Sequence, residues 1–333
     1  MTGSLIRMLL LSEKDVRRAL TMEDVIGAVE RASMAFSDKQ VEVPSRITLQ
    51  VKGESDAAIF LVAKDQSICF YGIKQASSFP SNKGKGVNTV FADIHLYSTE
   101  TGQPAAIVSA NHLTAMKTGA ASAVATKFLA KQGEAVLAII GTGVQAGTQL
   151  AGIQRVRPLR EVRLYDIDRS RAQAFAERLG DVRGSRVVIS ATPGECVSGA
   201  DIVVTATPSL TPVFSGESLS DGTHVNAVGS FTPYMQEIDS RSVLRASKIV
   251  TDNQEETWVV AGDLLVPLRE GKITRGAVYC NLGDIVAGKK PGRENEREIT
   301  IYESVGFAAL DIAVAAAAYT KAVEKGLGTK VDL

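Results

Sequence analysis

Three cationic side chains in the first third of the chain stand where strands or helices are expected to begin. Arg46 follows a Pro-Ser pair, Lys74 ends the sequence Tyr-Gly-Ile-Lys, and Lys117 lies in Thr-Ala-Met-Lys-Thr. An arginine can hold a carboxylate through two parallel hydrogen bonds, and a lysine desolvated near other cations can titrate low enough to act as an acid or base. Judged singly, each is more simply explained as a solvated surface charge.

The histidines and serines give no comparable pattern. His95 and His112 lack the spacing of metal ligands, and His224 opens an apolar strand, so a structural role is expected for all of them. Ser122 has no nucleophile-elbow context. We therefore expect no metal site and no serine nucleophile.

The sharpest local pattern is a dinucleotide-binding fingerprint. The apolar run Val136–Ile140 leads into a G-x-G-x-x-A sequence formed by Gly141, Gly143 and Ala146, and a helical pattern follows. Gly141 permits the tight turn, Gly143 lets the backbone approach a pyrophosphate, and Ala146 allows the helix to pack closely on the strand. The amino end of that helix would then face the phosphates.

An acidic residue completes this fingerprint about 20 residues further on, where the second strand of such a unit ends. Asp166 occupies that place, after the apolar run Val162–Tyr165. A carboxylate there accepts hydrogen bonds from ribose hydroxyls and repels a 2′-phosphate, which favours NAD(H). Arg169 and Arg171 follow closely, so the pattern leaves NADP(H) open.

The elements that must position these residues fall into two kinds. Residues 12–37 have helical spacing, and short strand-like runs between Arg46 and Tyr97 predict an α+β unit with antiparallel pairing. An Ala-rich helix over 114–130 leads into a second region, where apolar strands alternate with helices. Such alternation predicts a doubly wound parallel sheet, because parallel strands need crossover connections. Its six strands are expected at 136–140, 162–165, 187–190, 202–205, 224–228 and 249–251, and a final Ala-rich helix at 304–326.

Composition limits the classes of protein that fit. The 333 residues carry 37 basic and 37 acidic side chains, and a net charge of zero argues against a nucleic-acid partner. The longest apolar stretch, Val305 to Tyr319, contains Asp311 and is shorter than the roughly 20 residues that cross a bilayer. We expect a soluble protein with no membrane partner. Its cytoplasmic location is expected from three widely spaced cysteines, Cys69, Cys196 and Cys280.

Several separated motifs, in order, resemble the ornithine cyclodeaminase/μ-crystallin family over essentially the whole chain. The resemblance includes Arg46, Lys74 and the Gly141 fingerprint already described. It also includes Asn88-Thr89, Leu113-Thr-Ala-Met-Lys117-Thr118, Thr205-Ala-Thr207-Pro208, Asn226-Ala-Val-Gly229, Gly283-Asp-Ile-Val-Ala-Gly288 with the following Lys-Lys-Pro-Gly-Arg293, and Tyr302-Glu-Ser304-Val305-Gly306.

The resemblance implies a fold, an assembly and a set of site residues. It implies an α/β protein whose Rossmann doubly wound parallel sheet, residues 121–307, is inserted in an α+β substrate-binding and dimerisation domain, residues 1–120 plus 308–333, that forms a homodimer. Arg46, Lys74 and Lys117 would bind the substrate carboxylate, Lys74 would transfer a proton at the substrate nitrogen, and Val305 would lie against the substrate. The residues expected at the dinucleotide are Thr89, Lys117, Thr118, Gly141, Gly143, Val144, Gln145, Ala146, Asp166, Thr207, Val228, Gly229 and Ser304.

Two departures from the family pattern bear on the reaction. Lys117 stands where most members of the family have Arg, so a point-charge contact replaces a bidentate one. Ser230 stands where the cyclodeaminases have an Asp that serves as the acid/base for the ring-closing amine, and serine cannot take up that proton at neutral pH. Members with Ser at this catalytic position are more similar to ketimine or pyrroline-2-carboxylate reductases.

The leading hypothesis is therefore NAD(P)H-dependent reduction of a cyclic imino acid. The expected substrates are 1-pyrroline-2-carboxylate and 1-piperideine-2-carboxylate, with L-proline and L-pipecolate as products. Ornithine or lysine cyclodeamination with recycled NAD, and oxidative deamination of alanine, remain as alternative reactions. A ligand-binding protein without catalytic activity is the alternative from another class, because μ-crystallin-like relatives hold thyroid hormone.

Overall fold

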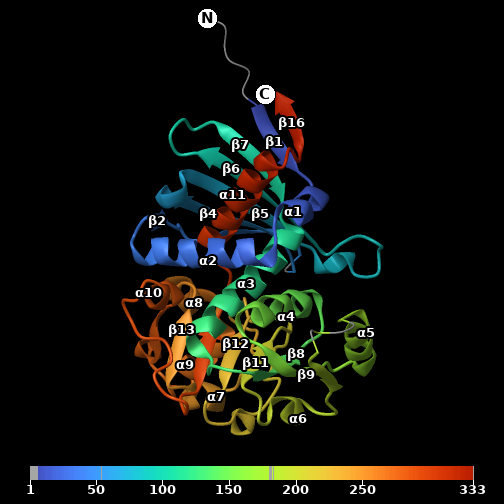
Figure 1. The fold of residues 1–333 in the computed structure, drawn as a ribbon, viewed down its shortest axis with the longest axis vertical. Helices are drawn as coiled ribbons and strands as arrows, with labels where there is room; N and C mark the ends of the chain where they lie inside the picture. The colour runs from blue at the N-terminus through green and yellow to red at the C-terminus, as the bar shows by residue number, and fades with distance from the viewer. Residues whose placement is uncertain (1–6, 54, 180–181, 183, 333) are drawn as a thin grey trace, which may run out of the picture. The chain divides into compact units, whose positions relative to one another are not determined.

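The computed structural model describes residues 7–53, 55–179, 182 and 184–332 (Figure 1). The chain divides into two compact units: Met1–Lys117 together with Phe307–Leu333 form unit 1, and Thr118–Gly306 form unit 2. Each unit contains its own eight-stranded sheet. The chain thus builds most of unit 1, then all of unit 2, and returns to unit 1 with its last helix and strand.

Unit 1 is an α+β structure, as the alternation of helical and strand-like runs predicted. Its strands pair antiparallel except for the parallel pair of β1 with β7. The sheet order is β16-β1-β7-β6-β5-β4-β2, with β3 paired to β4. The strands are β1 (Arg7–Leu11), β2 (Val41–Glu42), β3 (Ile47–Lys52), β4 (Asp56–Asp65), β5 (Phe70–Ser78), β6 (Val90–Ser98), β7 (Pro104–Ser109) and β16 (Thr329–Asp332).

Two short-range signals start the first helices of unit 1. Ser12 precedes α1 (Glu13–Ala19) and Thr21 precedes α2 (Met22–Ser37), and each forms a capping box with an aspartate three residues later. The last helix, α11 (Ala308–Glu324), is buried along most of its length and contacts α2, β4 and β5 (Figure 1). Its many alanines let it lie close to the sheet, so it belongs to the core of unit 1.

Unit 2 confirms the predicted Rossmann fold. All of its strand pairs are parallel, in the order β10-β9-β8-β11-β12-β15-β13-β14. The order reverses between β8 and β11, the place where doubly wound sheets bind ligands. The strands are β8 (Ala135–Ile140), β9 (Leu159–Tyr165), β10 (Arg186–Ile189), β11 (Ile202–Thr205), β12 (His224–Ala227), β13 (Lys248–Thr251), β14 (Val278–Asn281) and β15 (Thr300–Glu303).

Helices cover both faces of this sheet and enclose an apolar core on each. Helix α3 (Asn111–Leu129) begins in unit 1 and ends in unit 2. The other helices of unit 2 are α4 (Val144–Val156), α5 (Arg169–Leu179), α6 (Pro193–Val197), α7 (Ser240–Arg245), α8 (Gln254–Val260), α9 (Gly262–Arg269) and α10 (Leu282–Val286). The short 3₁₀ turns are η1 (Gln66–Ile68), η2 (Pro80–Asn82), η3 (Gly216–Ser218) and η4 (Arg275–Ala277).

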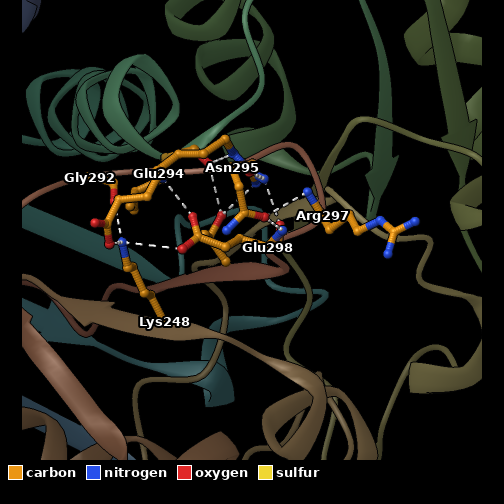
Figure 2. A network of polar contacts seen from close by, with 9 residues as sticks. Lys248, Gly292, Glu294, Asn295, Arg297 and Glu298 are labelled. Atoms are coloured by element: carbon orange, nitrogen blue, oxygen red, sulfur yellow. Dashed lines mark hydrogen bonds and ion pairs between the residues drawn. The ribbon is translucent and has the colours of Figure 1, made fainter.

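A buried lysine fixes the long segment that leads into β15. Lys248, the first residue of β13, donates to the carbonyl oxygen of Gly292 at 2.5 Å and to the carboxylate of Glu294 at 2.6 Å (Figure 2). The second carboxylate near its ammonium, Glu298 at 3.4 Å, in turn accepts the backbone N–H of Glu294. These contacts lie at the amino end of β13, opposite the strand ends that bind ligands in this fold, so their role is structural.

Candidate functional site

Lys74 and Lys117 share one carboxylate inside unit 1. Lys74 comes from β5, Lys117 from α3 and Asp311 from α11, and both ammonium groups lie 3.1 Å from the same Oδ1 of Asp311. All three side chains are almost completely buried. The other oxygen of Asp311, Oδ2, has no hydrogen-bond partner among the described residues. Two lysines and one carboxylate therefore leave one positive charge in excess in a buried environment.

Burial and the neighbouring charges change the pKa of Lys74. Burial lowers the pKa of Lys74, Asp311 works in the opposite direction, and Lys117 and Arg46 lower it again. Burial alone would raise the pKa of Asp311, but Lys117 and Lys74 hold it below its usual range. The cluster thus contains an ionised carboxylate and a lysine that releases its proton more readily than a lysine in water.

Local structure explains why Lys74 points toward Asp311. Side chains alternate along β5, so Gly72 and Lys74 share a face of the sheet, and a Cβ at Gly72 would lie 2.9 Å from the side chain of Ile312. That face is the one that α11 covers, which brings Lys74 to Asp311. Sequence reasoning noted Asp311 only as a charge that interrupts an apolar stretch. The available signal was the carboxylate of Asp311 within an otherwise apolar stretch, because a buried acid needs a cationic or hydrogen-bonding partner.

Arg46 lies close enough to the lysine cluster to influence it. It is half buried immediately before β3, and its charge is one of those that lower the pKa of Lys74. Unit 1 therefore brings together Arg46, Lys74 and Lys117, the residues expected to bind a carboxylate.

Thr89, expected at the dinucleotide, is an exposed residue just before β6, and its carbonyl oxygen accepts the N–H of Phe79 at 2.7 Å.

The fingerprint of unit 2 has the backbone that close approach to a dinucleotide requires. Gly141 has φ of +91°, and a Cβ there would lie 2.7 Å from the carbonyl oxygen of Ala206. Gly143, the N-cap of α4, provides no side-chain acceptor for the first turn of that helix, and a Cβ there would meet open space. The backbone N–H groups at this helix end thus suit an external anion. Ala146 is buried in the core beneath.

Asp166 is held in one position at the end of β9. Its Oδ2 accepts the N–H of Thr142 at 2.9 Å and the hydroxyl of Thr142 at 2.8 Å, and its Oδ1 accepts the N–H of Asp168 at 3.1 Å. Burial would raise the pKa of Asp166, but these bonds hold it below the usual value, so the group is ionised. A hollow of about 510 Å³ lies beside it, lined by Thr142, Gly143, Val144, Gly147, Arg171, Ala174, Phe175 and Arg178. These residues fit the adenosine and phosphate groups of NAD(H).

The remaining expected cofactor residues belong to unit 2, and most of them lie close to the ends of its strands. Val228 donates its N–H to the carbonyl oxygen of Thr205, and Ser304 donates its hydroxyl to Asp252 at 3.0 Å. Val305 is buried in a small apolar cluster with Val260 and Ala261. The other expected residues are Gln145 in the first turn of α4, Thr118 in α3, and Thr207 and Gly229 in the segments after β11 and β12.

Ser230 is fully buried, and its hydroxyl donates to the carbonyl oxygen of Met235 at 2.9 Å. This bond closes the loop that follows β12 and uses the only proton the side chain carries. An aspartate at this position would set a carboxylate against a carbonyl oxygen. The surrounding loop is thus built for a donor at position 230.

Metal sites and membrane-spanning helices were considered only for residues 7–53, 55–179, 182 and 184–332. Neither unit holds, within those ranges, a group of three or more His, Cys, Asp or Glu side chains arranged to bind a metal ion. No helix in the same ranges is long and apolar enough to pass through a membrane.

Sequence comparison identifies the family. A profile of the ornithine cyclodeaminase/mu-crystallin family matches residues 7–326. The chain belongs to this family. A relative from Bacillus cereus, described as Delta(1)-pyrroline-2-carboxylate reductase, is 38% identical over 325 residues, which cover 98% of this chain and 100% of the relative.

Two solved structures of family members show the same fold over nearly the whole chain. The Delta(1)-pyrroline-2-carboxylate reductase of Thermococcus litoralis, solved with NADH and L-proline, is 38% identical and superimposes with a TM-score of 0.93, covering 97% of this chain and 100% of its own. An archaeal alanine dehydrogenase, solved as a dimer with bound NAD, is 34% identical with a TM-score of 0.92, covering 98% and 99%. The family and the Rossmann fold expected from sequence are both confirmed, and NAD(H) is the cofactor of these neighbours.

Proposed function

We propose that this protein reduces a cyclic imino acid, 1-pyrroline-2-carboxylate, to L-proline with NADH. The observation that carries the proposal is the buried cluster of Lys74, Lys117 and Asp311, with its excess positive charge and a lysine of lowered pKa. The similarity to pyrroline-2-carboxylate reductases over nearly the whole chain supports the same reaction.

In the proposed mechanism, Arg46 and Lys117 hold the substrate carboxylate while Lys74 donates a proton to the imine nitrogen. Bound NADH supplies the hydride that the adjacent carbon receives. The nitrogen gains a proton, the carbon gains a hydride, and the C=N double bond becomes a single bond. Lys74 is left neutral and recovers its proton from water. Its lowered pKa makes it a better acid than an ordinary lysine at neutral pH.

Ser230 argues against ornithine cyclisation as the main reaction. Its hydroxyl is committed to the carbonyl oxygen of Met235, and it does not titrate at neutral pH. Reduction of an imine needs no second base to accept a proton from an amine. The loop after β12 therefore supports the reductase and leaves cyclodeamination without its acid/base.

For the cofactor we propose a preference for NADH over NADPH. Asp166 is ionised and immobilised beside the hollow at the helix end, where its charge would repel a 2′-phosphate. Arg171 lines the same hollow and would reduce that repulsion, so the preference is one of degree.

We also propose that the protein is a homodimer that works in the cytoplasm. Ile47, Leu49 and Val51 of β3 are each more than half exposed, and Val90 and Phe91 at the start of β6 add to the apolar surface of unit 1. An apolar surface of this kind is typical of a protein interface. The isolated cysteines support a reducing compartment. Sedimentation equilibrium of the chain and of a Leu49→Asp variant tests the dimer, and a monomeric wild type would refute it.

The function is tested by offering the purified protein three substrates in parallel. We expect 1-pyrroline-2-carboxylate to consume NADH, with ornithine and alanine giving much slower turnover. Ammonia release from ornithine without imine reduction would refute the proposal in favour of cyclodeamination. NAD reduction with alanine as the fastest reaction would refute it in favour of an alanine dehydrogenase.

A further inference from the structure

One apolar core of unit 2 ends in a layer of buried polar groups at the carboxyl edge of the sheet. Side chains alternate along a strand, so Thr205 continues the face of Val203, and Glu303 continues the face of Ile301. Glu237 and Asp263, from outside the sheet, are buried with them. The acids Glu237, Asp263 and Glu303 have fully buried side chains, although an unpaired charge in a core is costly. Because burying these acids costs folding free energy, we expect them to serve a function.

Glu237 differs from Asp263 and Glu303 because each of its two carboxylate oxygens accepts two hydrogen bonds. Its Oε2 accepts the hydroxyl of Thr205 at 2.9 Å and the N–H of Gly229 at 2.7 Å. Its Oε1 accepts both the N–H of Thr207 at 2.5 Å and the hydroxyl of Thr207 at 2.7 Å. One carboxylate therefore joins the segment that follows β11 to the segment that follows β12, the next strand in the sheet.

The surroundings of Glu237 are shaped for this bridge. A Cβ at Gly229 would lie 2.6 Å from Cδ of Glu237 and 2.3 Å from the carbonyl oxygen of Thr207, so only glycine admits the carboxylate here. Asp263, in the first turn of α9, holds the backbone: its Oδ1 accepts the N–H of Glu237 at 2.6 Å and that of Ile238 at 2.9 Å. Side chain and main chain of Glu237 are thus both fixed.

We infer that Glu237 is a positioning residue for the dinucleotide, which holds the Thr207 and Gly229 segments in the geometry that receives it. The inference rests on the proposed function, because Thr207, Val228 and Gly229 are residues we place at the cofactor. Without the carboxylate, two backbone N–H groups and two hydroxyls lose their acceptor, and each must find another by moving. Movement of either segment changes the surface offered to NADH.

The test compares Glu237→Gln with Glu303→Gln. Both acids are fully buried in the same layer, but the carboxyl oxygens of Glu303 have no hydrogen-bond partner in the described part of the chain. Burial and the neighbouring acids raise the pKa of Glu303 well above its usual value, which favours the neutral form that glutamine resembles. Burial raises the pKa of Glu237 too, but the hydrogen bonds from Thr207, Thr205 and Gly229 favour its charged form. Glutamine at 237 presents an NH₂ group to donors and keeps only one acceptor oxygen.

The readout is the Kd for NADH, from fluorescence titration, together with the melting temperature. We expect Glu237→Gln to weaken NADH binding about tenfold or more, because a lost acceptor for a buried donor commonly has an effect of that size. Glu303→Gln should keep the wild-type Kd. At saturating NADH, the KM of Glu237→Gln for the imine should remain close to that of the wild type, which a general loss of structure would not allow.

Each other outcome is decisive. If Glu237→Gln melts earlier but binds NADH like the wild type, its role is structural and the inference is refuted. Equal losses of affinity in both variants refute it too, because the four bonds would then not matter. If Glu237→Gln does not fold, Glu237→Asp takes its place: its carboxylate is one methylene too short to reach both segments, and an unchanged Kd refutes the inference. Failure of the wild type to bind NADH would refute the proposed function itself.

Discussion

Replacing Asp311 with Asn removes the only carboxylate in the lysine cluster and keeps its size. In the wild type, Asp311 opposes the effect of burial on Lys74, so it favours the protonated form of that lysine. In the variant, Lys74 and Lys117 face each other without the intervening negative charge. We expect the pKa of Lys74 to fall further below its ordinary value of 10.5.

The magnitude follows from the geometry. At 3.1 Å, each lysine attracts the carboxylate by about 5 kcal/mol in an effective dielectric of about 20. Relaxation and water entry reduce the net effect, and removing one partner of a buried ion pair typically costs about 3–5 kcal/mol of folding free energy. Even a quarter of the attraction, about 1.4 kcal/mol, lowers the pKa of Lys74 by about one unit.

The assay is the pH dependence of kcat/KM for the imine. Lys74 donates its proton only when charged, so activity should fall as the pH rises through the pKa of Lys74 in the folded protein. In Asp311→Asn, kcat/KM should begin to fall at a pH about one unit or more below the value for the wild type. Activity lost at neutral pH should then be partly recovered in more acidic solution. Urea titration should show less destabilisation at higher pH, since the unfolded state holds its lysine protons up to 10.5.

Asp56→Asn is the matched control. Asp56 is a buried acid of the same unit, but its carboxylate accepts from the N–H and hydroxyl of Ser81. This variant should lose stability and keep the wild-type position of the alkaline limb. An alkaline limb in Asp311→Asn that does not move, or that moves to higher pH, would refute the assignment of Lys74 as the proton donor.

Three further substitutions test other parts of the site. Lys74→Met leaves Lys117 and Asp311 as a neutral pair, so activity should fall about 100-fold or more while the free energy of unfolding is kept or rises; a large loss of stability would contradict this charge balance. Asp166→Ser should lower the KM for NADPH relative to that for NADH, and an unchanged ratio in steady-state kinetics would show that another group selects the cofactor. Ser230→Asp sets a carboxylate against a backbone carbonyl oxygen and should cost about 1–3 kcal/mol in urea denaturation, more than Ser230→Ala.

The Rossmann unit could be predicted from the sequence because its signals are local. A buried apolar strand, a glycine turn and an acid at the end of the next strand all lie within a short stretch, and each has its own physical reason. Six of the strands were predicted in this way. The strands β14 and β15 were missed, because Val278–Asn281 and Thr300–Glu303 are short and lack a clear flanking helix pattern. Chain order also places β13 after β12, whereas β15 lies between them.

One side of the unit 1 sheet, where β16 pairs with β1, could not be predicted for a different reason. β1 and β16 pair residues from the two ends of the chain, as in Leu10 with Thr329, and no local pattern encodes such a pairing. Strand β7, Pro104–Ser109, begins with proline, which usually argues against a strand unless it stands at the first position, as it does here.

The candidate site was predictable as a list of residues but not as an arrangement. Arg46, Lys74 and Lys117 stood out by type and by resemblance, yet nothing in their spacing shows that two of them share one carboxylate. Glu237 gave no signal at all, because its partners Thr205, Thr207 and Gly229 are ordinary strand-end residues until the parallel register places them around it. Clusters of this kind depend on contacts distant in sequence.

The net charge of the lysine cluster explains why the fold contains buried charges whose desolvation costs folding free energy. Across the whole chain the charges balance, but inside unit 1 two lysines meet a single carboxylate. One buried positive charge therefore has no counter-ion among the residues that the structure describes. A protein interior does not keep such a charge for stability, because desolvation outweighs what one shared partner returns. A substrate with one carboxylate supplies the missing negative charge and makes the cluster neutral. Burial of this cluster lowers the pKa of Lys74, and the charge of Lys117 adds to that effect. One buried cluster therefore both selects an anionic substrate and prepares the proton that its reduction consumes.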